Sequence, residues 1–296
     1  MRIEKIYFDA EDGLKLAGLL HTSESQAEDE VILSVHGMGS NCLKSRDDII
    51  ANLVTKNNIS YFTFNNRGQG IVDSIYTAEG KIVQGTAFED ILDSYYDIVG
   101  AIKALKQKGY RKIYLQGHSL GSTKIVYTYN RLIKNNETEL LDMIKAVLLL
   151  SLVDLVDVIN IMIKSNPQID IVSLAYEKEQ ERNIDCIIET KVPFLPYVSV
   201  KTFLRYYRDN QEINFAQYRN ENFKFEELSN IKVPLFMRWG NNKELISIPA
   251  NEVVSICNSK IKNENKDISF IDGATHNYMG KENILGEEIL RFLKQI

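Results

Sequence analysis

A serine between two glycines, placed directly after a run of strand-forming residues, most constrains how this chain folds. Tyr110–Ser122 reads YRKIYLQGHSLGS, and a segment compatible with a helix follows over residues 122–132. The pattern predicts a strand, a sharp turn and a helix, with Ser119 on the turn. Gly117 and Gly121 leave room for the strained backbone of such a turn. Taken alone, these residues also fit an ordinary glycine-rich turn with a surface serine.

The predicted turn has a chemical consequence for Ser119. Its hydroxyl would stand clear of its neighbours, and the backbone N–H of Leu120, at the start of the helix, would point toward an oxyanion formed on a substrate. A second donor is available in the loop His36–Ser40, which follows a buried strand. We expect the backbone N–H groups of Met38 and Leu120 to form an oxyanion hole.

The alternation of apolar segments predicts an α/β fold with a mostly parallel central sheet and helices on both faces. An antiparallel hairpin at 3–9 and 14–21 opens the sheet. Further strands are expected at 30–35, 61–64, 113–115, 145–152, 232–239 and 268–271, with helices at 41–56, 87–106, 122–132, 249–261 and 282–295.

One stretch departs from this alternation. Residues 156–229 contain several helix-like segments, many charges and tyrosines, and prolines that break the pattern. We predict a helical cap at 156–229, inserted into a core made of residues 1–155 and 230–296. A different interpretation is that these segments are further core helices.

Composition narrows the class of partner. The chain has 296 residues, a formal net charge of −5 and 44% hydrophobic residues. This balance argues against nucleic-acid and anionic-membrane partners and leaves a small molecule as the expected partner, with a homo-oligomer possible. The N-terminal charges and the lack of an apolar run of membrane length favour a cytoplasmic protein. Three widely spaced cysteines suggest neither a disulfide framework nor a zinc site, so no metal or cofactor is expected.

A serine nucleophile needs a base, and the base needs a carboxylate to orient it. His276 lies in a small-residue loop after the last predicted strand, where its side chain can project over the carboxyl edge of the sheet. For the acid, Glu244 in the loop after strand 232–239 is favoured. Asp154, just past strand 145–152, remains the alternative, whereas Asp272 is too near the end of its strand.

The remaining polar residues of these motifs are expected to support the structure. His118 would point away from its neighbour Ser119 and pack or form a hydrogen bond, and His36 would brace the glycine loop. Arg67, in Asn-Asn-Arg-Gly-Gln-Gly, would tie loops together through its planar guanidinium.

At this point the chain resembles the α/β-hydrolase superfamily over nearly its whole length outside 156–229. The motifs that carry the resemblance are G-H-S-L-G at Gly117–Gly121, H-G-M-G at His36–Gly39 and G-A-T-H at Gly273–His276. The resemblance implies Ser119 as nucleophile, His276 as base, and Met38 and Leu120 as oxyanion donors. The hairpin start and long cap look most like small intracellular carboxylesterases, including the cinnamoyl and feruloyl esterase type.

The sequence departs from the superfamily pattern at two places. The usual G-x-x-D after the penultimate strand is here Gly240–Lys243 without an aspartate, so the acid would come one position later, at Glu244. The usual D-x-R-G-x-G begins here with Asn65 instead of an aspartate. The first departure bears on the triad and the second on a structural detail.

Together the motifs predict a serine carboxylester hydrolase that works through a Ser-His-acid triad and an acyl-enzyme intermediate, without a cofactor. A serine at position 119 argues against the superfamily branches that use an aspartate nucleophile. Thioesterase, amidase or peptidase activity on the same triad stays open, because a fold does not fix a reaction. The sequence is also compatible with a lipase and with a non-catalytic relative that binds a ligand through the cap.

Overall fold

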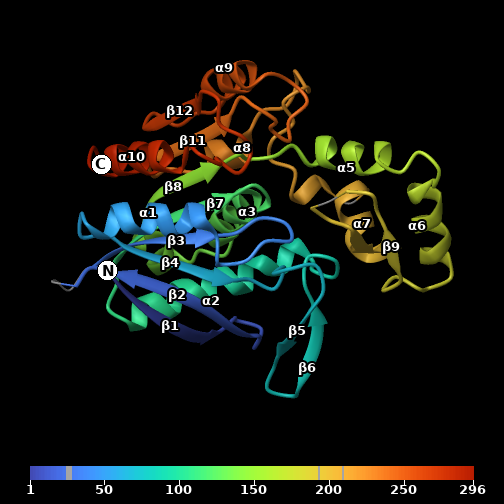
Figure 1. The fold of residues 1–296 in the computed structure, drawn as a ribbon, viewed down its shortest axis with the longest axis horizontal. Coiled ribbons are helices and arrows are strands. Elements are labelled where there is room, and N and C mark those ends of the chain that lie inside the picture. Colours follow the sequence, from blue (N-terminus) through green and yellow to red (C-terminus); the bar gives the residue numbers. More distant parts are fainter. Residues whose placement is uncertain (25–28, 193, 209) are drawn as a thin grey trace.

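The computed structural model describes residues 1–24, 29–192, 194–208 and 210–296. Within these residues, eight strands form one sheet in the order β1-β2-β4-β3-β7-β8-β11-β12 (Figure 1). The strands are β1 Arg2–Asp9, β2 Lys15–Thr22, β3 Glu30–Val35, β4 Ser60–Asn65, β7 Lys112–His118, β8 Ile144–Leu150, β11 Leu235–Gly240 and β12 Lys266–Ile271. The first two strands pair antiparallel and β2 pairs antiparallel with β4, whereas the strands from β4 to β12 in the sheet order are parallel. The predicted fold class is confirmed.

The central strands are apolar on both faces because helices cover both sides. On β3, Leu33 belongs to a core that includes Ile98 and Ile125, whereas its neighbour Ile32 belongs to a second core that includes Leu285. The first core lies under α2 Ser94–Gln107, α3 Leu120–Lys134 and α9 Ala250–Lys260, and the second under α1 Ser45–Thr55 and α10 Glu282–Leu293. Side chains alternate across a strand, so a continuous apolar run such as Glu30–Val35 indicates a strand buried on both faces.

Most of the segment between β8 and β11 lies beside one end of the sheet, at the right of Figure 1, but its last helix lies next to α3. It holds α5 Leu155–Lys164, α6 Ile171–Gln180, the strand pair β9 Ile187–Glu189 and β10 Tyr197–Ser199, α7 Val200–Tyr207, the 3-10 turn η2 Asn210–Glu212 and α8 Glu226–Ser229. A third apolar core lies here, and it also includes Ile91 and Leu120, which lie outside this segment. The antiparallel pair β9-β10 is an addition to the predicted helices.

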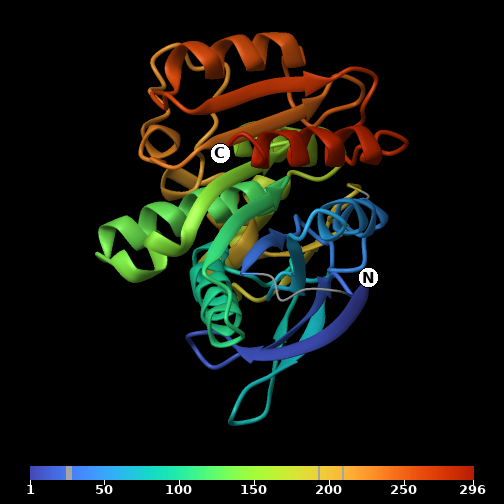
Figure 2. The ribbon, with the colours of Figure 1, turned by 90° about the vertical axis from the view of Figure 1, so that its left-hand side faces the viewer.

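Other elements were not expected from the sequence. The polar stretch after β4 contains an antiparallel hairpin, β5 Asp73–Tyr76 and β6 Lys81–Gln84, which extends away from the sheet. A 3-10 turn η1 Ile91–Asp93 precedes α2, and a short helix α4 Thr138–Met143 precedes β8. Helix α1 begins at Ser45 and not near residue 41, which leaves the residues after the glycine loop in an irregular segment. Figure 2 shows the twist of the sheet, with the N-terminal hairpin and β12 at opposite edges.

The structure contains no helix, among the residues it describes, that is both long and apolar enough to cross a bilayer. The same residues hold no cluster of three or more His, Cys, Asp or Glu side chains arranged to bind a metal ion.

Candidate active site

The carboxyl ends of five neighbouring parallel strands bring the site together. Gly37 follows β3, Ser119 follows β7, Ser151 follows β8, Glu244 follows β11 and His276 follows β12. Because parallel strands end at one edge of the sheet, these five loops meet there although they are far apart in sequence.

Ser119 occupies the sharp turn that the sequence predicts. Strand β7 ends at His118, helix α3 begins at Leu120, and Ser119 between them has φ 56° and ψ −125°. This region of backbone space is strained for a residue with a side chain. The flanking glycines allow it: a Cβ on Gly121 would lie 2.2 Å from the Val35 carbonyl oxygen, and one on Gly117 would lie 2.4 Å from that of Gly121. The predicted reason for both glycines is confirmed.

His276 is held by Glu244. The two side chains meet with 2.6 Å between His276 Nδ1 and Glu244 Oε2. The second carboxylate oxygen, Oε1, accepts hydrogen bonds from the Gly240 backbone N–H at 2.8 Å and from Ser151 Oγ at 2.6 Å. Burial alone would raise the pKa of Glu244, but the hydrogen bond and charge of His276, with the other donors, keep that pKa below its usual value. Glu244 therefore remains ionised and fixes both the tautomer and the orientation of the imidazole.

The local backbone explains how Glu244 reaches His276, although Glu244 lies one position later than the aspartate of the superfamily motif. Lys243 has φ 56°, a left-handed conformation that turns the chain back toward the end of β11. Glu244 follows this turn and closes it through the hydrogen bond from Gly240. The extra residue is thus absorbed in the loop, and the carboxylate still reaches the imidazole.

The alternative acid, Asp154, has another place in the structure. It caps the start of α5, where its Oδ1 accepts hydrogen bonds from the Val156 backbone N–H at 3.0 Å and from Asn214 Nδ2 at 3.2 Å. Burial raises the pKa of Asp154 to about 6. Within the described residues, no hydrogen bond or ion pair joins Asp154 to His276.

Two further residues position the histidine loop. His118 Nε2 lies 2.7 Å from the His276 carbonyl oxygen, and burial holds the pKa of His118 well below its usual value, so the ring is neutral and donates this hydrogen bond. The expected supporting role of His118 is confirmed. Ser151 was missed, because a single serine after a strand has no distinctive sequence pattern. Its position after the carboxyl end of buried strand β8 was the available signal.

The predicted oxyanion donors lie beside Ser119. A Cβ built on Gly37 would be 3.0 Å from Ser119 Cβ and 3.4 Å from the Leu120 backbone nitrogen, so the glycine loop runs directly against the turn. Met38, Leu120, Ser119 and His276 all border one cavity of about 780 Å³. Among the described residues, no hydrogen bond joins Ser119 Oγ to His276, a contact that often tightens only when substrate binds.

Both apolar and charged side chains border the cavity. The apolar side chains that border it are Met38, Ile71, Leu120, Val153, Leu155, Val158, Phe194, Leu245 and Met279. The charged ones, apart from His276, are Lys44, Arg46, Lys243 and Glu282. Such a lining suits a ligand with an apolar body and a few polar contacts.

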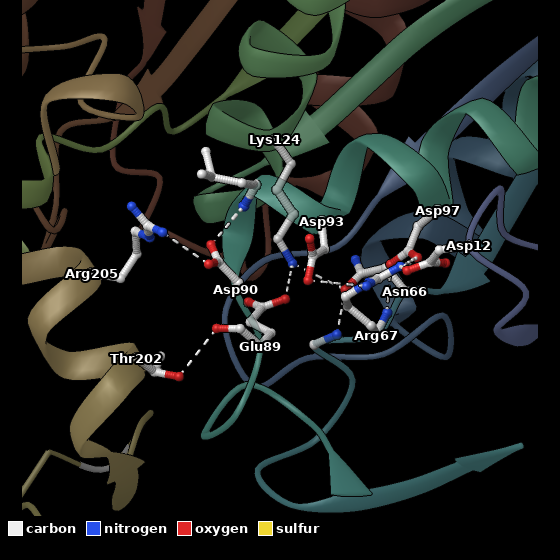
Figure 3. A network of polar contacts seen from close by, with 12 residues as sticks. Asp12, Asn66, Arg67, Glu89, Asp90, Asp93, Asp97, Lys124, Thr202 and Arg205 are labelled. Carbon is white, nitrogen blue, oxygen red and sulfur yellow. Dashed lines mark hydrogen bonds and ion pairs between the residues drawn. The ribbon is translucent and has the colours of Figure 1, made fainter. Parts of the chain in front are cut away.

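Arg67 lies in a separate buried network (Figure 3). Its Nε donates to Asp97 Oδ1 at 3.0 Å, and its Nη2 donates to Asp97 at 2.7 Å and to Asp12 Oδ2 at 2.8 Å. Next to it, fully buried Lys124 on α3 donates to Glu89 Oε2 at 2.7 Å and to Asn66 Oδ1 at 3.0 Å. Arg67 does not border the cavity, and its predicted structural role is confirmed.

Comparison with solved structures identifies the architecture. Est1E from Butyrivibrio proteoclasticus, with ferulic acid bound, aligns with a TM-score of 0.67 over 98% of this chain and 98% of that chain, at 16% identity. A soluble variant of monoglyceride lipase from Saccharomyces cerevisiae aligns with a TM-score of 0.66 over 100% and 96%, at 14% identity. The chain has the α/β-hydrolase fold. The Pyrococcus furiosus esterase Pf2001 shares this fold at 17% identity, with a TM-score of 0.64 over 99% and 91%.

The sequence comparisons agree with this fold. The family model described as serine aminopeptidase, S33, matches residues 26–144 of this chain, a range that contains the glycine loop and Ser119. A search of curated proteins found no match. The resemblance to the α/β-hydrolase superfamily that the motifs indicate is thus confirmed, and the neighbours in structure include esterases and a lipase.

Proposed function

We propose that this α/β-hydrolase is a serine esterase that cleaves carboxylic esters through an acyl-enzyme intermediate. The observation that carries the proposal is the 2.6 Å hydrogen bond between His276 and Glu244 at the cavity that Ser119 borders. A strained serine, an oriented imidazole and a buried carboxylate are the parts that nucleophilic acyl transfer requires. The esterase and lipase neighbours support the same class, and the family model, described as serine aminopeptidase, supports a serine hydrolase.

In the proposed mechanism, Ser119 Oγ attacks the ester carbonyl carbon while His276 takes the hydroxyl proton. Because Nδ1 of His276 is held by Glu244, Nε2 is the nitrogen that accepts this proton. The backbone N–H groups of Met38 and Leu120 stabilise the negative charge on the carbonyl oxygen. His276 then returns the proton to the departing alcohol. Water, deprotonated by the same histidine, releases the carboxylic acid and restores Ser119.

We assign the segment 156–229 the role of a cap that forms part of the substrate site, with residues 1–155 and 230–296 as the hydrolase core. Val158 and Phe194 from this segment border the cavity, next to Val153 and Leu155 from the end of the core. Their apolar surface favours an ester with an aliphatic or aromatic acyl group.

A second candidate follows from the family model, whose description is that of a serine aminopeptidase. The same triad could hydrolyse a peptide bond, but an aminopeptidase must also bind a cationic α-amino group. Lys44, Arg46 and Lys243 border the cavity with Glu282 as the carboxylate among its lining residues, a balance that disfavours such a group. Aminoacyl p-nitroanilides test this candidate against esters of the same acyl length.

The proposal is tested by hydrolysis of p-nitrophenyl acetate and butyrate. We expect the purified protein to hydrolyse both, and Ser119→Ala to lose about 10³-fold or more in kcat. Lys294→Met, a change at an exposed position outside the cavity, serves as the control and should match the parent protein. A folded parent protein that is inert toward both esters would contradict the proposal and favour a non-catalytic ligand-binding role.

A further inference from the structure

The three buried arginines of the described residues differ in how well their guanidinium groups are satisfied. Arg67 and Arg238 are each 2% exposed, and Arg46 is 5% exposed. Arg238 donates from Nε to Glu288, from Nη1 to two backbone carbonyls and from Nη2 to Asp267. Every nitrogen of Arg67 also has an acceptor or an ion-pair partner. Arg46 does not follow this pattern.

Arg46 uses one of its three side-chain nitrogens. Its Nη2 contacts the carboxylate of Asp47, at 3.1 Å from Oδ2. Its Nε is buried and has no hydrogen-bond partner, and within the described residues none is found for Nη1 either. A guanidinium has five N–H donors, and buried donors are nearly always satisfied, so this side chain has unused capacity.

The carboxylate beside Arg46 does not belong to it alone. Asp47 Oδ1 also accepts a hydrogen bond from the hydroxyl of Tyr61 at 2.7 Å and one from Ser34 Oγ at 3.3 Å. Asp47 is therefore held in the core by three donors, and Arg46 shares it. The positive charge at Arg46 is offset, but its donors are not saturated.

Arg46 borders the catalytic cavity, and so does the start of helix α1. Lys44 is the N-cap residue of this helix and makes no side-chain capping bond, and Lys44, Ser45 and Arg46 all line the cavity. The free N–H groups of a first helical turn carry partial positive charge and favour an anion. The helix start and the unsatisfied guanidinium thus act at the same end of the cavity.

Three other charged side chains border the same cavity. Lys44 and Lys243 are exposed and form no ion pair with any residue in the described part of the chain. Glu282 opposes them with one negative charge. With Asp47 counted as the partner of Arg46, the cavity retains a net positive charge.

We infer that this end of the cavity binds an anionic oxygen group of the substrate, a carboxylate or a phosphate, through Arg46 and the start of α1. The inference rests on the proposed esterase function and names its substrate class: esters that carry an anionic group in addition to the scissile bond. Arg46 would bind that group through Nη1, which has no partner among the described residues and is not one of the fully buried nitrogens, whereas Lys44 and Lys243 would attract it electrostatically.

The test compares anionic and neutral esters of equal chain length. Mono-p-nitrophenyl adipate and suberate are the carboxylate substrates, p-nitrophenyl hexanoate and octanoate are their neutral counterparts, and p-nitrophenyl 6-(phosphonooxy)hexanoate is the phosphate arm. The variants are Arg46→Met, Arg46→Lys and Lys44→Met, with Lys294→Met as the control. The measured quantity is the ratio of kcat/KM for the anionic ester to that for the neutral ester, after subtraction of the uncatalysed rate.

We expect this ratio to be about tenfold or more in the parent protein for at least one anionic arm, as a charge-assisted hydrogen bond implies. It should fall to about one in Arg46→Met, recover in part in Arg46→Lys, and stay unchanged in Lys294→Met. The anionic ester with the larger ratio shows whether the site prefers a carboxylate or a phosphate. Equal ratios in the parent protein and Arg46→Met would overturn the inference, because they would mean that Arg46 does not distinguish the anionic ester from the neutral one.

Two further measurements keep the inference separate from folding and from the esterase proposal. If Arg46→Met does not fold, the same kcat/KM ratio is measured in Lys44→Met and, for the parent protein, at about 0.5 M NaCl. We expect the ratio to fall severalfold in each case, because both changes weaken the attraction of the anionic ester. Binding of monomethyl adipate and of methyl hexanoate to Ser119→Ala, measured by calorimetry, requires no hydrolysis. Tighter binding of the anionic ester supports the inference even if no ester is cleaved, and equal binding of the two overturns it.

Discussion

Arg67 and Arg46 are both buried, yet their surroundings differ. Arg67 lies between Asp97 and Asp12, and its donors are used within the protein (Figure 3). Arg46 lies at the edge of the cavity and shares a single carboxylate with Tyr61 and Ser34. A buried charge that is fully satisfied supports the fold, whereas one left partly unsatisfied beside a cavity is available to a ligand.

The network around Arg67 also supports the site indirectly. Lys124 on α3 binds Glu89 and Asn66, and Asn66 in turn makes two hydrogen bonds with His36, at the start of the glycine loop. The backbone carbonyl of Glu89 accepts a hydrogen bond from Thr202 of α7. The network around Arg67 and Lys124 therefore links helix α3, the glycine loop and the segment between β8 and β11. Changes here should affect stability, and changes at the cavity should affect catalysis.

The largest expected effect separates the two candidate acids. Glu244→Gln removes the negative charge that orients and stabilises the protonated His276, and we expect kcat to fall about 10⁴-fold. Asp154→Asn, the matched carboxylate-to-amide change, should leave kcat within a few fold, because Asp154 caps α5. Steady-state kinetics with p-nitrophenyl butyrate measure both. A larger loss of kcat in Asp154→Asn than in Glu244→Gln would identify Asp154 as the acid.

The next largest effect concerns stability. Arg67→Met removes the guanidinium that pairs with fully buried Asp97 and leaves this carboxylate, within the described part of the chain, only the hydrogen bond from the backbone N–H of residue 67, and we expect a loss of about 3–5 kcal/mol in the free energy of unfolding. Arg46→Met should cost about 1–2 kcal/mol, because Asp47 keeps its hydrogen bonds from Tyr61 and Ser34. Urea denaturation measures both losses. If the two variants are equally destabilised, the contrast between the two arginines fails.

A third effect is the pH dependence that Asp154 imposes. Its pKa is about 6 in the folded protein, against about 3.9 in an unfolded chain. Between these values the folded protein binds more protons than the unfolded one, so stability decreases as pH rises from about 4 to 6, by about 3 kcal/mol in total. Asp154→Asn removes this slope and keeps the side-chain oxygen that caps α5. Denaturation at pH 4 and pH 8 should show little difference between variant and parent at the lower pH and a more stable variant at the higher. If stability depends on pH in Asp154→Asn as it does in the parent protein, Asp154 is not the group that causes this dependence.

The smallest effect tests the support of the acid. Ser151→Ala removes one of the hydrogen bonds to Glu244 Oε1, while that from the Gly240 backbone remains. We expect about a tenfold loss in kcat/KM and little loss of stability, because Tyr278 keeps its hydrogen bond to the Arg238 carbonyl. Ser259→Ala, on the exposed side of α9, is the control. A loss as large as that of Glu244→Gln would mean that Ser151 acts as more than a support.

Much of the fold follows from local sequence patterns. The strand at Glu30–Val35 was predicted with its observed limits, since a short and nearly continuous apolar run that leads into a glycine loop is typical of a strand buried on both faces. The reason for Gly117 and Gly121 was also predicted, because the backbone geometry of the turn alone requires small residues. The hairpin β5-β6 was missed, because most of its side chains are exposed and lack the alternation that marks a half-buried strand.

The site was predictable only in part. Ser119 and His276 come from motifs, so their places in the chain could be read directly. For the partner of His276 the sequence favoured Glu244, which forms the hydrogen bond in the structure, but it left Asp154 open because the choice depends on how two loops far apart in sequence meet in space. The state of Arg46 was beyond sequence analysis as well, since it depends on which acceptors fail to reach a buried guanidinium.

The most direct test of the central claim is covalent labelling of the nucleophile. The purified protein is treated with a fluorophosphonate, its intact mass is measured, and the modified peptide is mapped. We predict a single adduct on Ser119, absent from Ser119→Ala and formed much more slowly in Glu244→Gln. A folded parent protein that acquires no adduct, or acquires one at a different residue, would contradict the assignment of Ser119 as the nucleophile.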